Sequence, residues 1–191
     1  MKSCSGLGDL PADEVPEAAL LGRSNVGKSS LLNVLAGQHQ LARTSRTPGR
    51  TRLLNLFDVN GGRVRLVDCP GYGYAKVARS EREGWGELIE PYLAQRPNLR
   101  LALLLVDATL PAQPPDLDLH AWLALRPYPT LVVATKCDRL SGNQRPQALA
   151  RLKAAFGEEP LPFSAITRLG RDPLRGRLLA VGQSAPTRTP A

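Results

Sequence analysis

Short apolar runs alternate with amphipathic segments along most of the chain. The runs at 101–108 (LALLLVDA) and 130–135 (TLVVAT) are apolar almost throughout, which is typical of strands buried on both faces. A third run, 17–22 (EAALLG), ends in glycine and is also predicted to be a strand. Segments 52–59 and 63–68 flank the triplet Asn-Gly-Gly, and this arrangement predicts a β-hairpin.

Helical patterns follow the strands. Segment 28–37 places three leucines on one face and ends at Gly37, which predicts a helix with a glycine stop. Ser80 and Glu83 have the spacing of a capping box and predict the start of a second helix. Three more helices are predicted within 116–125, 147–156 and 173–181. The alternation indicates an α/β fold, with a six-stranded, mostly parallel sheet, one antiparallel hairpin and helices on both faces.

The chain has the size and composition of one globular domain. It contains 191 residues, of which 42% are hydrophobic, and this suffices for a sizeable core. Polar ends predict a flexible arm over 1–13 and a flexible tail over 183–191, around a domain spanning 14–182. No apolar run approaches the roughly 18 residues of a membrane span, and no signal-peptide pattern is present. We therefore expect a cytoplasmic monomer without membrane contact.

Charge and residue types narrow the classes of function. The formal net charge is +8, which predicts a polyanionic partner such as nucleic acid, although a surface that only maintains solubility is an equal alternative. Cys4, Cys69 and Cys137 lack metal-ligand spacing, and the last two are predicted to be small buried side chains. His39 and His120 are the only histidines, so a Ser–His or Cys–His mechanism has little to build on.

A phosphate-binding loop is the strongest motif. Residues 22–29 read GRSNVGKS, a full match to G-x-x-x-x-G-K-[ST], between a predicted strand and a predicted helix. Glycines let backbone N–H groups surround phosphates, and the helix N-terminus adds partial positive charge. We expect Lys28 to reach the β- and γ-phosphates and act in catalysis, and the Ser29 hydroxyl to ligate Mg²⁺.

Two segments are predicted to sense the γ-phosphate. Asp68 ends the strand after the hairpin and is expected to hold Mg²⁺ through water, while the Gly71 N–H binds the phosphate. In the polar loop before the hairpin, Thr51 is expected to complete the magnesium shell and to act in catalysis, with Thr47 as the alternative. Tyr72 stands where many GTPases keep a glutamine that orients the attacking water, so we expect slow intrinsic hydrolysis.

The last two motifs are predicted to recognise the base of the nucleotide. Asp138 closes the sequence TKCD after an apolar strand, and its carboxylate can accept hydrogen bonds from the guanine N1–H and 2-amino groups, which adenine cannot match. The aliphatic stem of Lys136 is expected to cover the base. In FSAIT, Ser164 and Ala165 are predicted to direct backbone N–H groups at the guanine O6.

Together these motifs identify a P-loop GTPase, and longer stretches show a closer resemblance. GRSNVGKSS, TSRTPGRTRLLNLF, LVDCPGYGYAKV, TKCDRL and FSAIT resemble the EngB/YihA (YsxC) family of bacterial ribosome-biogenesis GTP-binding proteins. The resemblance implies a Ras-like G domain, GTP hydrolysis with Mg²⁺, and a role in assembling the large (50S) ribosomal subunit on its rRNA, linked to cell division and septation. It also implies K⁺ beside the phosphates at Asn25. Thr109 and Leu110 depart from an Arg–His-like pair that is usual in the family.

The motifs and the resemblance define a predicted GTP site. Its residues are Gly22, Arg23, Ser24, Asn25, Val26, Gly27, Lys28, Ser29 and Ser30 in the P-loop, Gly49, Arg50, Thr51, Asp68, Cys69, Pro70 and Gly71 in the switches, and Thr135, Lys136, Cys137, Asp138, Phe163, Ser164 and Ala165 around the base.

Three classes of function stay open. The favoured one is a slow GTPase in ribosome assembly, accelerated on its partner; the others are a small signalling GTPase and a non-hydrolysing, nucleotide-dependent scaffold. Basic side chains around both switches are expected to meet rRNA phosphates, with an ordinary solvated face as the alternative. These side chains are Arg43, Arg46, Arg50, Arg52, Lys76, Arg79 and Arg82.

Overall fold

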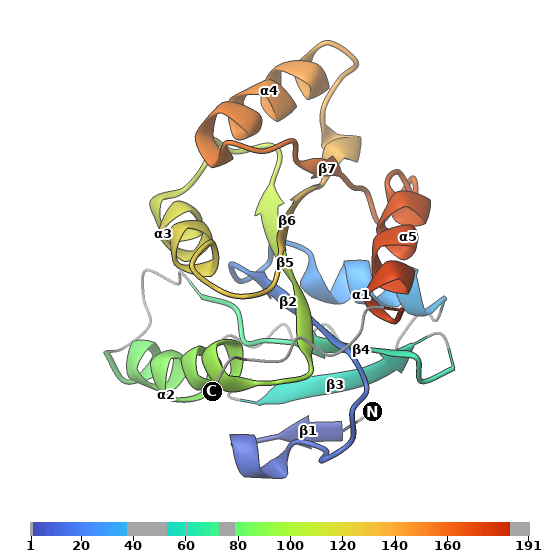
Figure 1. Ribbon diagram of the computed structural model, residues 1–191. Coiled ribbons are helices and arrows are strands. Elements are labelled where there is room, and N and C mark those ends of the chain that lie inside the picture. Colours follow the sequence, from blue (N-terminus) through green and yellow to red (C-terminus); the bar gives the residue numbers. More distant parts are fainter. Residues whose placement is uncertain (1, 38–52, 60, 73–78, 184–191) are drawn as a thin grey trace.

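One mixed sheet organises the protein. The computed structural model describes residues 2–37, 53–59, 61–72 and 79–183, with the backbone alone over 79–85. The sheet has seven strands in the order β1-β3-β4-β2-β5-β6-β7 (Figure 1). The strands are β1 Lys2–Cys4, β2 Glu17–Gly22, β3 Leu54–Val59, β4 Val64–Asp68, β5 Leu99–Asp107, β6 Thr130–Thr135 and β7 Leu161–Pro162. The pairs β1–β3 and β3–β4 are antiparallel and the remaining pairs are parallel.

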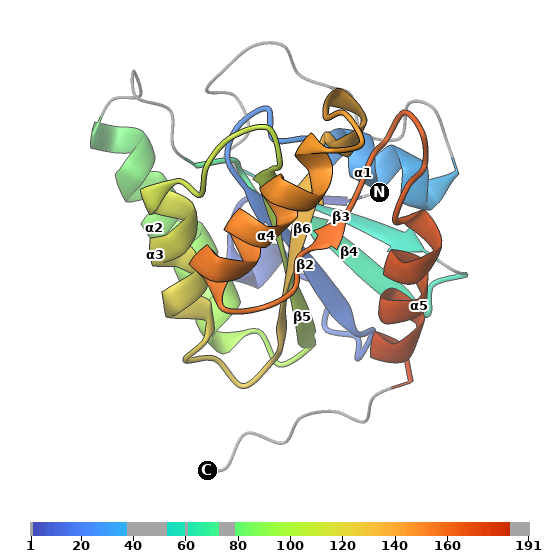
Figure 2. The same cartoon turned by 90° about the horizontal axis from the view of Figure 1, so that it is seen from above.

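Helices cover both faces of the sheet, as Figures 1 and 2 show. The α-helices are α1 Lys28–Ala36, α2 Arg79–Gln95, α3 Pro114–Leu123, α4 Gln144–Phe156 and α5 Arg171–Val181. Buried side chains of α2, α3 and α4 form one apolar layer, and those of α1 and α5 form the other. Strand β5 supplies both layers by alternation, with Leu104 on the first side and Leu103 on the second. This explains why its sequence is apolar throughout.

The sheet has one strand more than the six predicted, because Lys2–Cys4 pairs with β3. Cys4 lies opposite Leu54 in the register and is fully buried. A short 3₁₀ helix, Leu7–Asp9, follows this strand. The prediction of a loose arm over 1–13 was therefore wrong for these residues, since three residues are too few to show a strand period. Of the predicted tail, only Gln183 lies within the described residues.

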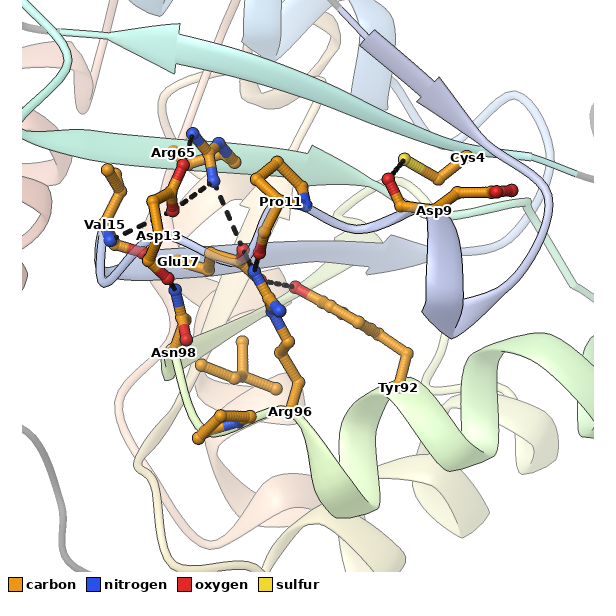
Figure 3. A network of polar contacts seen from close by, with 12 residues as sticks. Cys4, Asp9, Pro11, Asp13, Val15, Glu17, Arg65, Tyr92, Arg96 and Asn98 are labelled. Atoms are coloured by element: carbon orange, nitrogen blue, oxygen red, sulfur yellow. Dashed lines mark hydrogen bonds and ion pairs between the residues drawn. The ribbon is translucent and has the colours of Figure 1, made fainter.

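Buried ion pairs hold the N-terminal segment at the amino end of the sheet (Figure 3). Arg96 bonds both carboxylate oxygens of Glu17, with its closest contact at 2.6 Å, and the Tyr92 hydroxyl donates to Glu17 at 3.0 Å. Arg65 of β4 bonds the two oxygens of Asp13 at 2.9 and 3.0 Å. Arg96 also donates to the Pro11 carbonyl at 2.9 Å. The segment before β2 is therefore tied to β4 through Asp13 and to the end of α2 through Pro11, while Glu17 joins β2 to α2.

The predicted turns are found where the sequence placed them. Gly61 and Gly62 have φ angles of 68° and 80°, which suits the tight connection between β3 and β4. Gly37 caps α1 with φ 66°. The side chains of Ser80 and Glu83 lie outside the described part of the chain, so the predicted capping box stays a prediction. None of the described helices is both long enough and apolar enough to cross a membrane.

Candidate nucleotide-binding site

The P-loop connects the buried strand β2 to α1 through backbone that only certain residues adopt. Gly22 has φ 150°, and a Cβ there would lie 2.8 Å from the Leu105 carbonyl oxygen. Gly27 precedes α1 with φ 115°, and Asn25 is left-handed with φ 63°. The first glycine therefore permits close strand packing and the second permits the turn into the helix. This geometry leaves Asn25 exposed at the loop tip.

Lys28 lies folded back over the P-loop. Its Nζ donates to the Gly22 carbonyl at 2.9 Å and lies 3.4 Å from the Arg23 carbonyl oxygen. Burial lowers the pKa of Lys28, while the nearby carboxylate of Asp68 opposes this shift. A cationic amine is thus held at the start of α1 without a salt bridge to the described residues, which suits it to an anionic ligand.

Asp68 carries a polar atom that the described protein does not satisfy. Its Oδ1 is buried and has no hydrogen-bond partner among the described residues, although such atoms are normally paired. Burial raises the pKa of Asp68 to about 6, and the Lys28 charge acts against this rise. The Asp68 carboxylate lies beside the phosphate-binding loop, and the Ser29 hydroxyl lies in the first turn of α1. Both groups offer the oxygen ligands that Mg²⁺ prefers.

The P-loop also touches the predicted γ-phosphate sensor. A Cβ on Gly71 would lie 2.9 Å from both Lys28 Nζ and Ser24 Oγ, so no larger residue fits without movement. The Ser24 N–H donates to the Tyr72 carbonyl at 3.1 Å. The structure therefore brings Lys28 and Gly71 together, and that both residues meet the γ-phosphate stays a prediction.

The two base-recognition motifs are bonded to each other. The Ser164 hydroxyl donates to Asp138 Oδ1 at 2.6 Å and accepts N–H groups from the following turn. Ser164 therefore orients the carboxylate that is predicted to select guanine. Its own N–H donates to the Leu169 carbonyl at 3.1 Å. In this arrangement the Ser164 N–H is engaged within the protein. That Ser164 and Ala165 direct N–H groups at the guanine O6 therefore stays a prediction.

Thr135 and Lys136 fasten the base loop to the P-loop and β5. The Thr135 hydroxyl lies 2.7 Å from the Val26 carbonyl oxygen and 3.0 Å from that of Val106. Lys136 is left-handed with φ 58°, and its Nζ bonds Asp107 Oδ2 at 2.7 Å. Such strained backbone at a non-glycine residue needs support from its surroundings, and these bonds supply it.

Asp107 is a site residue that the sequence reasoning missed. It ends β5 between the ends of β2 and β6, at the edge where open α/β sheets place their ligands, and that position was a usable signal. Thr109 departs from the usual family residue and caps Asp107, with its hydroxyl at 2.6 Å. Leu110 is 41% exposed.

Asp116 was missed as well. It lies in the first turn of α3, is 3% exposed, and accepts the Tyr72 hydroxyl at 2.9 Å. Burial raises the pKa of Tyr72, so the hydroxyl keeps its proton. In this position the Tyr72 hydroxyl is engaged by α3 rather than by a water at the phosphates.

Several predicted site residues have buried side chains or lie outside the described part of the chain. Cys69, Cys137 and Phe163 are at most 2% exposed, which confirms that the two cysteines are small buried side chains. Residues 38–52 and 73–78 are outside the described part of the chain. The predictions for Thr47, Gly49, Arg50 and Thr51 therefore stay predictions, as do those for Arg43, Arg46, Arg52, Lys76 and the side chains of Arg79 and Arg82.

A pocket of about 200 Å³ lies beside the P-loop. Ser24, Asn25, Asp107 and Lys136 contribute to its walls. A larger hollow of about 630 Å³ lies over α4, and none of its lining residues belongs to the predicted nucleotide motifs. The larger cavity is therefore not the candidate nucleotide site. The smaller one is the candidate, because residues of the nucleotide motifs line it.

The comparisons with known proteins agree with this geometry. The family model for the 50S ribosome-binding GTPase matches residues 17–136. The probable GTP-binding protein EngB of Pelotomaculum thermopropionicum is 49% identical over 174 residues, covering 89% of this chain and 87% of the relative. The chain belongs to the EngB family of GTP-binding proteins. The EngB protein of Geobacter metallireducens is 46% identical over 91% of this chain and 87% of its own length.

Solved structures support the same fold. The crystal structure of a probable GTP-binding protein EngB matches with TM-score 0.71 and 23% identity, over 87% of this chain and 98% of that one. Aquifex aeolicus Era bound to GDP·AlF₄⁻ matches with TM-score 0.67 and 23% identity, over 91% of this chain and 58% of that one. The predicted Ras-like P-loop fold is thereby confirmed. As an EngB-family chain, the protein is a GTP-binding member of the P-loop GTPases, a class that generally uses Mg²⁺.

Proposed function

We propose that this chain is a slow GTP-hydrolysing switch that acts, as a cytoplasmic monomer, in assembly of the large ribosomal subunit. The observation that carries the GTPase part is the buried Asp68 Oδ1, which has no partner among the described residues and lies near the folded-back Lys28. A polar atom of this kind costs free energy unless a ligand completes it. A nucleotide phosphate with its metal ion would supply the missing contacts.

Ser29, Thr51 and, through water, Asp68 would hold Mg²⁺. The ion would neutralise the charge that develops on the β- and γ-phosphates. Asn25 stands exposed at the loop tip, and we extend the proposal to K⁺ at that position. Equal hydrolysis rates in Na⁺ and K⁺ would remove this part of the proposal.

The remaining chemistry belongs to side chains and N–H groups of the chain. Lys28 would move from the carbonyls of the loop to the terminal phosphates, and the Gly71 N–H would bind the γ-phosphate. Asp138, oriented by Ser164, would select guanine. The Tyr72 hydroxyl bonds α3, which supports a site without a polar side chain to orient the attacking water. Intrinsic hydrolysis is therefore expected to be slow until a partner supplies a group that orients the attacking water.

The basic surface supports the ribosomal partner. Several arginines in α4, in α5 and in the connections between elements are exposed, and the net charge of the chain is +8. They are Arg63, Arg139, Arg151, Arg168, Arg175 and Arg177. Exposed guanidinium groups in this number suit contacts to RNA phosphates. The match to a 50S ribosome-binding GTPase model points the same way.

Two measurements test the proposal. Single-turnover GTP hydrolysis is expected to be slow for the chain alone and faster with purified large ribosomal subunits. No hydrolysis in either condition would refute the proposed GTPase activity. Co-sedimentation with subunits is expected to be stronger with a GTP analogue than with GDP and to weaken as salt rises. Equal sedimentation with both nucleotides would remove the switch from the proposal.

A further inference from the structure

Tyr72, the residue after Gly71, is fixed at both its backbone and its side chain. Its carbonyl accepts the Ser24 N–H at 3.1 Å, and it forms a parallel bridge with Arg23. Its hydroxyl donates to Asp116 Oδ1 at 2.9 Å. The ring packs against the apolar layer under α2, α3 and α4. Tyr72 therefore joins the P-loop to α3.

Asp116 is a well-supported anchor for this bond. It is 3% exposed, and its own N–H donates to the Gln113 carbonyl at 2.9 Å. Leu119 and Leu123 bury the same helix against the sheet, with 8% and 0% exposure. Burial raises the pKa of Asp116, while the hydrogen bond from Tyr72 and the charge of Arg23 oppose the rise. The anchor thus belongs to a packed helix rather than to a loop.

The bond acts one residue away from the predicted phosphate contact. Gly71 lies so close to Lys28 and Ser24 that an added Cβ would be 2.9 Å from polar atoms of both. Since Tyr72 is held by Ser24 on one side and Asp116 on the other, Gly71 cannot leave the P-loop unless one of these bonds breaks.

We propose that Tyr72 and Asp116 are a positioning pair that holds Gly71 against the P-loop, with its N–H ready for the γ-phosphate. The inference rests on the proposed GTP switch and extends it, because it gives Tyr72 a role other than orienting water. Only the triphosphate offers a γ-phosphate to Gly71, so the pair favours GTP over GDP. A ligand shifts an equilibrium only through such differential contacts.

The test compares Tyr72→Phe with the wild-type chain. The affinities for a non-hydrolysable GTP analogue and for GDP are measured in Mg²⁺, together with the single-turnover rate. We expect the ratio of analogue to GDP affinity to fall about 3- to 10-fold, the range of one lost hydrogen bond, with GDP affinity nearly unchanged and a slower rate. Tyr128→Phe is the matched control, since it removes a buried hydroxyl bond to the Leu93 carbonyl at 2.8 Å and should leave the ratio unchanged.

Variants of Asp116 separate positioning from simple destabilisation. Asp116→Asn keeps an acceptor oxygen and should retain most of the ratio, whereas Asp116→Leu should lower it. Adding Tyr72→Phe to Asp116→Leu should cause no further loss. The proposed positioning role would be refuted if Tyr72→Phe and Tyr128→Phe had the same ratio of analogue to GDP affinity. Additive losses in the double variant would refute it as well. A wild-type chain that binds no GTP analogue would instead overturn the proposed function and the pair with it.

Discussion

Two buried carboxylates, at opposite ends of the sheet, differ in how far the described protein satisfies them. At the amino end, the charged groups of Glu17, Arg65 and Arg96 are joined to one another and to Tyr92 and Asp13 (Figure 3). At the carboxyl end, Asp68 Oδ1 is buried without a partner among the described residues. The partnered Glu17 stabilises the fold, whereas Asp68 has contacts left for a ligand. A buried carboxylate oxygen that the described residues leave unsatisfied therefore points to a ligand site.

The largest expected effect is at the carboxyl end. Lys28→Ala removes the cation that would meet the terminal phosphates, and we expect GTP affinity to fall about 10³-fold. Fluorescence titration with a labelled GTP measures this, and thermal unfolding checks that the variant is folded. Lys153→Ala is the control, because that exposed lysine pairs with the exposed Glu159 and lies outside the nucleotide motifs. A loss below about 10-fold would contradict the P-loop assignment.

The amino end should show the opposite response. Glu17→Gln removes the fully buried carboxylate that neutralises Arg96, whose side chain is only 11% exposed, so we expect the free energy of unfolding to fall by about 3 kcal/mol. GTP affinity of the folded variant should stay within about 2-fold of wild type. Urea unfolding provides the measurement. Glu158→Gln, which breaks the more exposed pair with His120, should cost less than about 1 kcal/mol. Equal losses in the two variants would refute a special stabilising role for Glu17.

The stability of the nucleotide-free protein should depend on pH through Asp68. The pKa of Asp68 is raised to about 6 by burial, so the folded protein binds this proton more tightly than the unfolded chain does. Stability contributed by the protonated form is complete below about pH 4 and is lost as the pH rises through 6. Asp68→Asn should flatten this part of the curve and be more stable than wild type at pH 7.5, by on the order of 1–2 kcal/mol.

Urea midpoints at pH 4.5 and 7.5 measure this difference. Asp118→Asn changes an exposed aspartate of α3 and should leave the wild-type pH dependence in place. If Asp68→Asn kept that dependence too, the buried carboxylate would not be its source.

The smallest effect concerns the orientation of the base selector. Ser164→Ala removes the 2.6 Å hydrogen bond to Asp138, and we expect about 5-fold weaker GTP binding. The selectivity for GTP over ATP should fall with it. Thr167→Ala, in the same loop, removes only a 3.5 Å contact to the Leu169 N–H and serves as the control. Matching affinities in the two variants would mean that Ser164 does not orient Asp138.

Local patterns explain which features could be predicted. The apolar runs of β5 and β6, the hairpin glycines and the P-loop are each encoded within a few neighbouring residues, and all were predicted. The bond between Tyr72 and Asp116 joins residues 44 positions apart, and that between Glu17 and Arg96 joins residues 79 apart. No periodicity reports such pairs, because they exist only once the sheet has assembled. Strand β1 escaped prediction since its three residues gain their place from β3.

The Mg²⁺ dependence of GTP binding shows whether Asp68 belongs to a metal–nucleotide site. GTP affinity is measured by calorimetry with Mg²⁺ and with EDTA, for the wild-type chain and for Asp68→Asn. If the unpartnered Asp68 oxygen belongs to a metal–nucleotide site, Mg²⁺ should strengthen wild-type binding at least about 10-fold and the variant by less than about 2-fold. An equal Mg²⁺ effect in both proteins would mean that Asp68 does not help to hold the metal ion.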